Sequence, residues 1–135
     1  MYVKRTIENK ISKFLKRREI IAIVGARRCG KTTLMKHLFS KLKNAKYISF
    51  DDQEILRMFS TDINLFIESY VKDTKFLFID EFQYAKEGGK QLKFIYDNHK
   101  VKIVISGSSA ADLSIHSIKH LVGRVFVFIL APFSF

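Results

Sequence analysis

The chain has 135 residues, enough for one domain with a single core, and its 47% hydrophobic and 27% charged residues exclude an intrinsically disordered protein. Its one cysteine, Cys29, excludes a disulfide framework within the chain. The longest apolar run, 125–131, is far shorter than the roughly 20 residues that span a bilayer, and the N-terminal residues do not resemble a signal peptide. We therefore expect a soluble, cytoplasmic protein without membrane contact.

The net charge of +11 is unevenly distributed along the chain. Residues 1–50 hold 14 Lys and Arg against 2 Asp and Glu, whereas residues 51–97 carry a net charge of −4. A basic N-terminal third is typical of proteins that bind nucleic acid or another polyanion. Some of these cations could instead serve a bound nucleotide, and others could be solvated lysines on helix faces. The sequence therefore leaves nucleic acid as one of three explanations for the basic residues in 1–50.

The first predicted elements are a helix, a strand and a second helix. Apolar residues at helical spacing predict an amphipathic helix over 7–15, with basic residues on its other faces. The mostly β-branched run 20–24 ends at Gly25 and predicts a strand that is buried on both faces, as in a parallel sheet. Apolar residues from Leu34 to Leu42 again repeat at helical spacing.

The segment between this strand and the second helix is GARRCGKTT, residues 25–33, which fits the phosphate-loop pattern G-x-x-x-x-G-K-[ST]. The glycines let backbone N–H groups turn toward the phosphates, the lysine neutralises their charge, and the hydroxyl binds Mg²⁺. A strand before the loop and a helix after it are the context that this motif requires. The predicted nucleotide-binding residues are Gly25, Ala26, Arg27, Arg28, Cys29, Gly30, Lys31, Thr32 and Thr33.

Strands and helices alternate through the rest of the chain. We expect strands over 47–50, 76–79, 101–105 and 125–130, and helices over 62–71, around 92–96 and over 110–121. Ser60 or Thr61 is the expected cap of the helix over 62–71. Asp51 and Asp52 either start a loop or reach a metal ion, and we prefer the loop. The alternation predicts an α/β fold, with a parallel five-stranded sheet between two layers of helices.

Two acids follow the predicted strand 76–79. Ligands of open α/β sheets sit at the carboxyl ends of the strands, so Asp80 and Glu81 should meet the phosphates there. Asp80 is the expected Mg²⁺ ligand, together with Thr32. Glu81 should point the other way and act as the base that deprotonates an attacking water. The alternative is that both acids cap a turn after a buried strand.

Further polar residues fit a catalytic role beside Lys31 and Glu81. Ser106, or Ser108 if its strand is longer, follows the next strand and could hydrogen-bond a phosphate or the water, although Ser-Gly-Ser-Ser is also ordinary turn chemistry. Arg124 precedes the last strand, where it could be supplied to the site of a second subunit in a homo-oligomer, or could be a simple surface arginine.

Four segments occur together in this order: GARRCGKTTL, FIDEFQ, ISGSS and LVGRVFVFILAPFSF. Together they resemble archaeal and bacterial ATPases of the AAA+ superfamily, in the group with a DUF4143-type C-terminal region. The resemblance implies ATP rather than GTP, a P-loop NTPase sheet in the order 5-1-4-3-2, and Asp80 and Glu81 as Walker B acids. It also implies a serine sensor and Arg124 as an arginine finger, and Arg27 and Arg28 are typical of the group.

Members of this group usually continue beyond the segment that matches Pro-Phe-Ser-Phe, into a lid and further domains. We therefore expect residues 1–135 to form a single ATPase core, either as a fragment or as a minimal protein. The first functional hypothesis is Mg²⁺-dependent ATP hydrolysis. The alternatives are a slow nucleotide-binding switch and a DNA-associated module that needs a partner.

Overall fold

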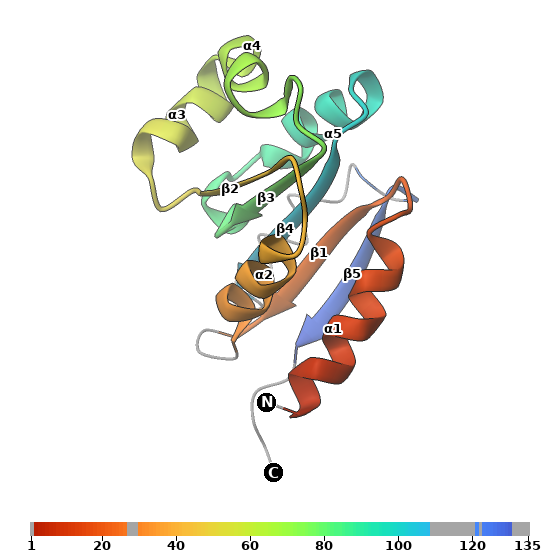
Figure 1. Cartoon of the computed structure of the whole chain (residues 1–135). Helices are drawn as coiled ribbons and strands as arrows, with labels where there is room; N and C mark the ends of the chain where they lie inside the picture. Colours follow the sequence, from red (N-terminus) through yellow and green to blue (C-terminus); the bar gives the residue numbers. More distant parts are fainter. Residues whose placement is uncertain (1, 27–29, 109–120, 122, 131–135) are drawn as a thin grey trace.

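Five strands form one sheet in the computed structural model, which describes residues 2–26, 30–108, 121 and 123–130 (Figure 1). The strands are β1 (Ile20–Gly25), β2 (Ala45–Ser49), β3 (Phe76–Asp80), β4 (Lys102–Ser108) and β5 (Val125–Leu130). All four pairings are parallel, and the order across the sheet is β2-β3-β4-β1-β5. This topology confirms the predicted parallel α/β fold and the predicted strand order.

Helices cover both faces of the sheet, as Figure 1 shows. The helices α1 (Tyr2–Phe14) and α2 (Lys31–Ser40) pack on one face. The other face carries α3 (Gln53–Thr61), α4 (Ile63–Phe66) with the π-helical turn η1 (Ile67–Val71), and α5 (Gly88–Asn98). A short 3₁₀ turn, η2 (Phe82–Tyr84), follows β3. The helix predicted over 110–121 lies almost entirely outside the described residues.

The two faces of the sheet carry separate hydrophobic clusters because side chains alternate along each strand. In β1, Ile20 and Ala22 contact the cluster under α3 to α5, whereas Ile21 and Ile23 contact the cluster under α1 and α2. Every residue of β1 is buried. A strand covered on both faces needs a continuous apolar sequence, which explains why this strand was predictable.

An ion-pair cluster joins α1 to α2 and so fixes the helix that follows the phosphate loop. The buried Glu8 carboxylate accepts a hydrogen bond from Lys41 Nζ at 2.6 Å and lies 2.9 Å from His37 Nδ1. Burial acts to raise the pKa of Glu8, but Lys41 and His37 outweigh it and lower that pKa below its usual value. Helix α2 is thereby held from its carboxyl-terminal end.

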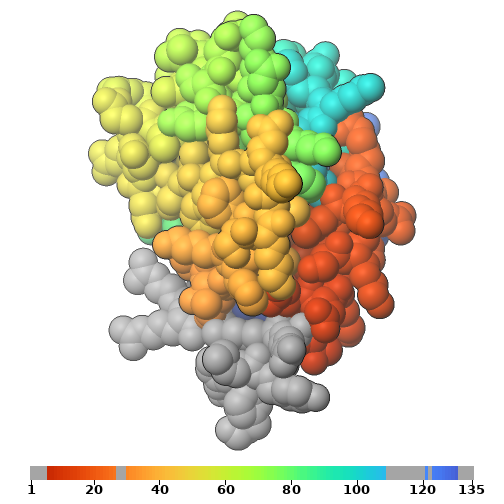
Figure 2. All heavy atoms as spheres, in the orientation of Figure 1, coloured from red at the N-terminus to blue at the C-terminus, as the bar shows by residue number. Residues whose placement is uncertain are grey.

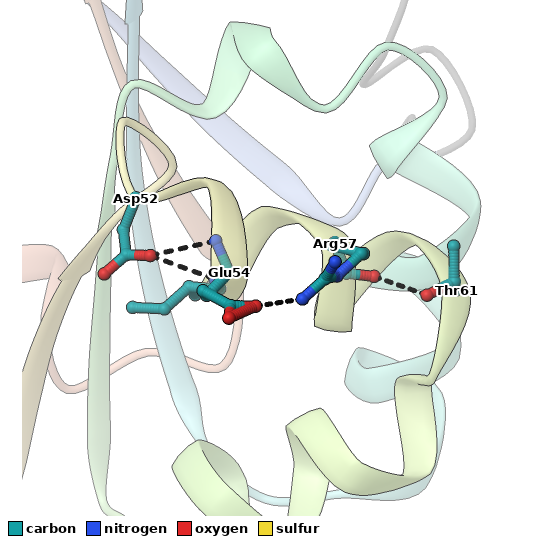
Figure 3. A network of polar contacts seen from close by, with 5 residues as sticks. Asp52, Glu54, Arg57 and Thr61 are labelled. Atoms are coloured by element: carbon teal, nitrogen blue, oxygen red, sulfur yellow. Dashed lines mark hydrogen bonds and ion pairs between the residues drawn. The ribbon is translucent and has the colours of Figure 1, made fainter.

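Helix α3 was not predicted from the sequence. Asp52 is its N-cap, and one Asp52 oxygen accepts hydrogen bonds from Glu54 N at 3.0 Å and Ile55 N at 3.3 Å. Figure 3 shows this cap together with the ion pair between Glu54 and Arg57 on the exposed face of the helix. In this structure Asp52 therefore caps a helix rather than starting a loop, while Asp51 lies in the exposed turn before it.

The predicted cap of the next helix was wrong. Asp62 caps α4, since its carboxylate accepts a hydrogen bond from Leu65 N at 3.2 Å. Ser60 and Thr61 belong to the last turn of α3 instead, where Thr61 Oγ1 donates to Arg57 O at 2.7 Å (Figure 3). The expected single helix over 62–71 is α-helical only as far as Phe66 and then continues as a π-helix.

No helix in the described part of the chain is both long enough and apolar enough to cross a bilayer.

Gly88, the first residue of α5, lies in close contact with the aromatic core. A Cβ atom at this position would lie 2.7 Å from Phe82 Cζ, 2.9 Å from Ala85 Cβ and 3.3 Å from Phe59 Cε2. Phe59 and Phe82 are fully buried, so a shift of either ring would disturb the packing of its neighbours in the core. The absence of a side chain at Gly88 is what allows α5 to pack this closely.

We therefore predict that Gly88→Ala lowers the free energy of unfolding by about 1–3 kcal/mol, the usual cost of overpacking a core. Urea unfolding followed by circular dichroism would measure the change. Lys90→Ala, an exposed change in the same helix, is the control and should alter stability by less than about 0.5 kcal/mol. Equal stability of the two variants would contradict the close packing.

Candidate nucleotide-binding site

The phosphate-loop motif begins where β1 ends and finishes in the first turn of α2. Gly30 is the N-cap of α2 and has a φ of 87°, in the left-handed region that glycine adopts without strain. No side chain caps this helix, and its first turn contains no acidic residue, in contrast to α3 and α4 with their aspartate caps. Its amino-terminal N–H groups are therefore well suited to an anion.

Lys31 is folded back toward the end of β1. Its side chain is buried, and Nζ donates hydrogen bonds to Gly25 O at 2.9 Å and Ala26 O at 3.3 Å. The ammonium therefore lies beside the start of the loop, as the motif requires. The predicted Arg27, Arg28 and Cys29 lie outside the described residues. Thr33 lies in the first turn of α2 and is exposed.

Asp80, the last residue of β3, is a buried carboxylate with a full set of hydrogen bonds. Its Oδ2 accepts bonds from Thr32 Oγ1 at 2.8 Å and from the Tyr47 hydroxyl at 2.7 Å. Its Oδ1 accepts bonds from Ser106 Oγ at 2.5 Å and from Glu81 N at 3.0 Å. These donors come from α2, β2 and β4 and from the residue that follows β3, so Asp80 joins four parts of the site.

The alternation of β3 determines which way each acid points. Phe78 packs in the cluster under α2, and Asp80, two residues further, shares that face and meets Thr32. Ser106 follows Val104 on the same face of β4. The sheet thus brings together Thr32, Asp80 and Ser106, which the sequence placed 26 or more residues apart.

Glu81 has a backbone conformation that is uncommon outside glycine. Its φ of 56° lies in the left-handed region, where the chain turns from β3 into η2. Its Oε1 accepts a hydrogen bond from Gln83 Nε2 at 2.7 Å, and Gln83 Oε1 accepts one from Ser108 N at 3.3 Å. The carboxylate is thus linked through Gln83 to the end of β4. A strained residue held by its neighbours in this way is a common feature of active sites.

Tyr47 completes the surroundings of Asp80. Burial raises the pKa of the Tyr47 phenol, and its hydrogen bond to Asp80 and the charges of Asp80 and Glu81 raise this pKa further. Tyr47 therefore remains a hydrogen-bond donor throughout the neutral range. Its ring stacks with Phe78 at a centroid distance of 6.2 Å, which orients the hydroxyl toward the end of β3.

The residues present fit a magnesium ion bound together with phosphates. No group of three or more His, Cys, Asp or Glu side chains in the described residues could hold a metal by itself. Mg²⁺ does not need such a group, because it is usually bound by one or two carboxylates, substrate phosphates and water. The Thr32 hydroxyl and the Asp80 carboxylate supply adjacent oxygen ligands beside the phosphate loop.

Arg124 is not part of this constellation within one chain. It directly precedes β5, whose first residue pairs with Ile20, the first residue of β1. Arg124 therefore lies at the amino-terminal edge of the sheet, where its Nε is 3.6 Å from Asp97 Oδ1. Lys31, Asp80 and Glu81 lie at the opposite, carboxyl-terminal edge.

Sequence reasoning missed Tyr47 and Gln83 as members of the site. Tyr47 precedes Asp80 by 33 residues and reaches it only because β2 and β3 are neighbours in register. Gln83 is the last residue of the segment FIDEFQ, and the sequence pattern assigned no role to it. A polar residue two positions after Glu81, in a turn, was the signal that could have drawn attention to it.

The parallel sheet and the loop with its facing carboxylate define a P-loop nucleotide-binding domain of the AAA+ type. The profile of the AAA_14 family, described as an AAA domain, matches residues 17–135, and the chain therefore belongs to this family. The uncharacterized protein MJ1637 of Methanocaldococcus jannaschii is 30% identical over 125 residues, which cover 79% of this chain and 25% of MJ1637.

Solved structures share the fold at low sequence identity. AMPPCP-bound DnaA from Aquifex aeolicus has a TM-score of 0.64 at 21% identity, covering 92% of this chain and 44% of that chain. The Pif1 helicase of Candida albicans has a TM-score of 0.66 at 11% identity, and the match covers 97% of this chain and 39% of the Pif1 chain. Drosophila ORC bound to DNA has a TM-score of 0.62 at 10% identity, and the match covers 98% of this chain and 94% of the ORC chain. The chain thus spans a quarter of MJ1637 and less than half of the DnaA and Pif1 chains.

The bond between Tyr47 and Asp80 gives a prediction about stability. Tyr47→Phe should lower the free energy of unfolding by about 1–2 kcal/mol, because a hydrogen bond to a charged acceptor contributes roughly that amount. Urea unfolding would measure it. Tyr84→Phe is the matched control, since Tyr84 is exposed and its hydroxyl bonds to none of the described residues. A loss no larger than that of the control would show that Tyr47 does not support Asp80.

Proposed function

We propose that this domain binds ATP with Mg²⁺ and hydrolyses the bond between the β and γ phosphates. The observation that carries the proposal is the hydrogen bond of 2.8 Å between Thr32 and Asp80, beside Lys31 and the uncapped start of α2. Two oxygen atoms this close to each other can share one metal ion, which supports the proposal. Family membership and the fold of AMPPCP-bound DnaA support the same function.

Binding rests on groups of the chain that face the phosphates. Gly25, Ala26 and Gly30 shape the loop, the N–H groups at the start of α2 face an anion, and the Lys31 ammonium neutralises its charge. The bound Mg²⁺ would neutralise phosphate charge and orient the terminal phosphate. Thr32 and Asp80 would hold it, and Tyr47 and Ser106 keep the Asp80 carboxylate in its orientation.

Glu81 is the proposed base that takes a proton from the attacking water. It follows Asp80 directly, and its backbone N–H bonds to both Asp80 Oδ1 and Ser106 Oγ, which fixes its position against the end of β4. Gln83 donates to Oε1 of Glu81, which orients the carboxylate. Ser106 is the proposed sensor residue, and a second copy of the chain would supply Arg124 to stabilise charge during phosphoryl transfer.

One observation favours a second candidate function, a nucleotide-binding switch with slow turnover. The proposed base is already hydrogen-bonded to Gln83, which is in turn bonded to Ser108 of β4. The side chain of Gln83 occupies one oxygen of this carboxylate, so that oxygen is less accessible to an attacking water. A switch of this kind would bind ATP and hydrolyse it only after Gln83 released Glu81.

We predict that Glu81→Gln keeps ATP binding and lowers the rate of phosphate release by about 10²–10⁴-fold, the usual contribution of a general base. Lys31→Ala should lose ATP binding. Phosphate release with Mg²⁺ and binding of a fluorescent ATP analogue would measure the two properties. Glu87→Gln is the control, because Glu87 is exposed and lies outside the site. Unchanged hydrolysis by Glu81→Gln would refute its role as the base.

The Gln83→Ala variant separates the two candidate functions. If Gln83 orients the base of an active ATPase, we expect turnover to fall about tenfold or more with ATP affinity unchanged. If Gln83 restrains the base of a switch, turnover should rise instead.

The same assay over a range of protein concentrations tests whether two subunits share a site. If Arg124 is supplied by a second subunit, activity per chain should rise with protein concentration, and Arg124→Ala should lose this activity.

A further inference from the structure

A basic pocket lies at the amino-terminal edge of the sheet, opposite the nucleotide site. It is an open pocket with a volume of about 640 Å³. Its six cationic side chains come from three separate segments, namely the turn between α1 and β1, the start of β3 and the start of β4. They are Lys16, Arg17, Arg18, Lys75, Lys100 and Lys102. We call these six residues, with the apolar side chains between them, the basic pocket.

Among the residues that the structure describes, no acidic side chain lines this pocket. The nearest neutralising acid is Glu19, 3.5 Å from Arg17 Nε. Lys16, Lys75 and Lys100 are exposed and form no ion pair with any residue in the described part of the chain. Two acids outside the lining partly offset these six cations: Glu19 lies beside Arg17 and Lys102, and Asp97 interacts with Arg18. The excess of positive charge attracts a polyanion.

Hydrogen bonds hold the three segments in place, so the pocket is preformed. Lys102 N donates to Lys75 O at 2.9 Å, which joins the starts of β3 and β4. The buried Lys102 ammonium donates to Arg17 O at 2.7 Å and to Glu19 O, which joins both strands to the turn after α1. Figure 2 shows red N-terminal atoms meeting green and cyan atoms of much later residues on this side of the molecule.

Lys102 itself favours an anion in the pocket. Burial lowers the pKa of Lys102 to about 8, with a smaller contribution from Arg17, while Glu19 acts in the opposite direction. The hydrogen bonds of this ammonium go to carbonyl oxygens, and the charge of Glu19 only partly offsets its burial. A phosphate oxygen beside it would reduce the remaining cost.

The floor of the pocket is apolar and includes Leu15, Phe76 and Val101. A duplex keeps its base faces stacked inside the helix, so it offers no exposed base face to this floor. A single strand offers phosphates together with exposed base faces, which need both cations and apolar or aromatic contacts. Arg18 is held at the edge of the pocket, since its guanidinium lies 4.0 Å from the centre of the Tyr96 ring and donates a hydrogen bond to Tyr96 O.

We propose that the basic pocket binds the backbone of single-stranded nucleic acid, with a base placed against its apolar floor. The site is separate from the nucleotide site, because its residues lie at the opposite ends of the same strands. β4 carries Lys102 at one end and Ser106 near the other, and β3 runs from Phe76 to Asp80. The proposal does not depend on whether the domain hydrolyses ATP.

The test compares two double variants that remove the same charge. Lys75→Gln with Lys100→Gln changes two exposed lysines of the pocket, and Arg57→Gln with Lys90→Gln changes two exposed cations on α3 and α5. Fluorescence anisotropy would measure the affinity for a labelled oligothymidylate of about 12 nucleotides, a length within the usual range of single-strand sites. Each measurement is made over a series of salt concentrations.

Wild type should bind with an affinity that falls steeply with salt. In the pocket variant the slope of log K against log salt should decrease by about 1.4, which is about 0.7 for each of two phosphate contacts, and affinity at about 0.1 M salt should fall about 25-fold. The control variant should bind like wild type. A matching oligouridylate distinguishes RNA from DNA as the single strand that is preferred.

Five results would overturn the proposal. Four of them are no binding by wild type at low salt, equal loss in the control variant, tighter binding of a duplex than of the single strand, and equal binding of polyglutamate at matched charge. The fifth is a loss of oligonucleotide binding in Lys31→Ala, which would place the oligonucleotide in the phosphate loop instead. Unfolding midpoints of both double variants, expected to match wild type, ensure that a lost affinity reports the pocket.

Discussion

The arrangement of the nucleotide site depends on the burial of the Asp80 carboxylate. A buried carboxylate is costly unless donors surround it, and here the donors come from α2, β2, β4 and the turn after β3. Each donor can reach Asp80 only when its own element lies in the correct position beside β3. The need of one buried carboxylate for hydrogen-bond donors thus specifies how α2, two neighbouring strands and the turn after β3 meet.

The parallel sheet connects this site to the basic pocket. Three strands that begin beside the pocket, β1, β3 and β4, end beside the phosphate loop and its partners. The strands are buried and hydrogen-bonded along their length, so the distance between the two edges is fixed by the fold. If both edges bind anions as proposed, a rigid sheet between them suits a protein that contacts a nucleotide and a polymer at the same time.

The predictable parts of this fold were those encoded by contiguous residues. β1, the phosphate loop and α2 follow from an apolar run, a motif and a helical repeat. Helix α3 was missed although Ile55, Met58 and Phe59 have helical spacing after Asp52, because this pattern is short and Ser60 and Thr61 also resemble a cap. The contact between Tyr47 and Asp80 and the basic pocket depend on register and on segments far apart in the chain, which no local pattern reports.

The left-handed backbone of Glu81 has a consequence for how this site can change. Glycine and asparagine hold such a conformation with little or no strain, but neither has a carboxylate. A glutamate there keeps an acid beside Asp80 and accepts a less stable turn. Replacement by either of those residues would relax the turn and remove the acid in one step, so selection for stability alone would remove the carboxylate that the proposed hydrolysis requires.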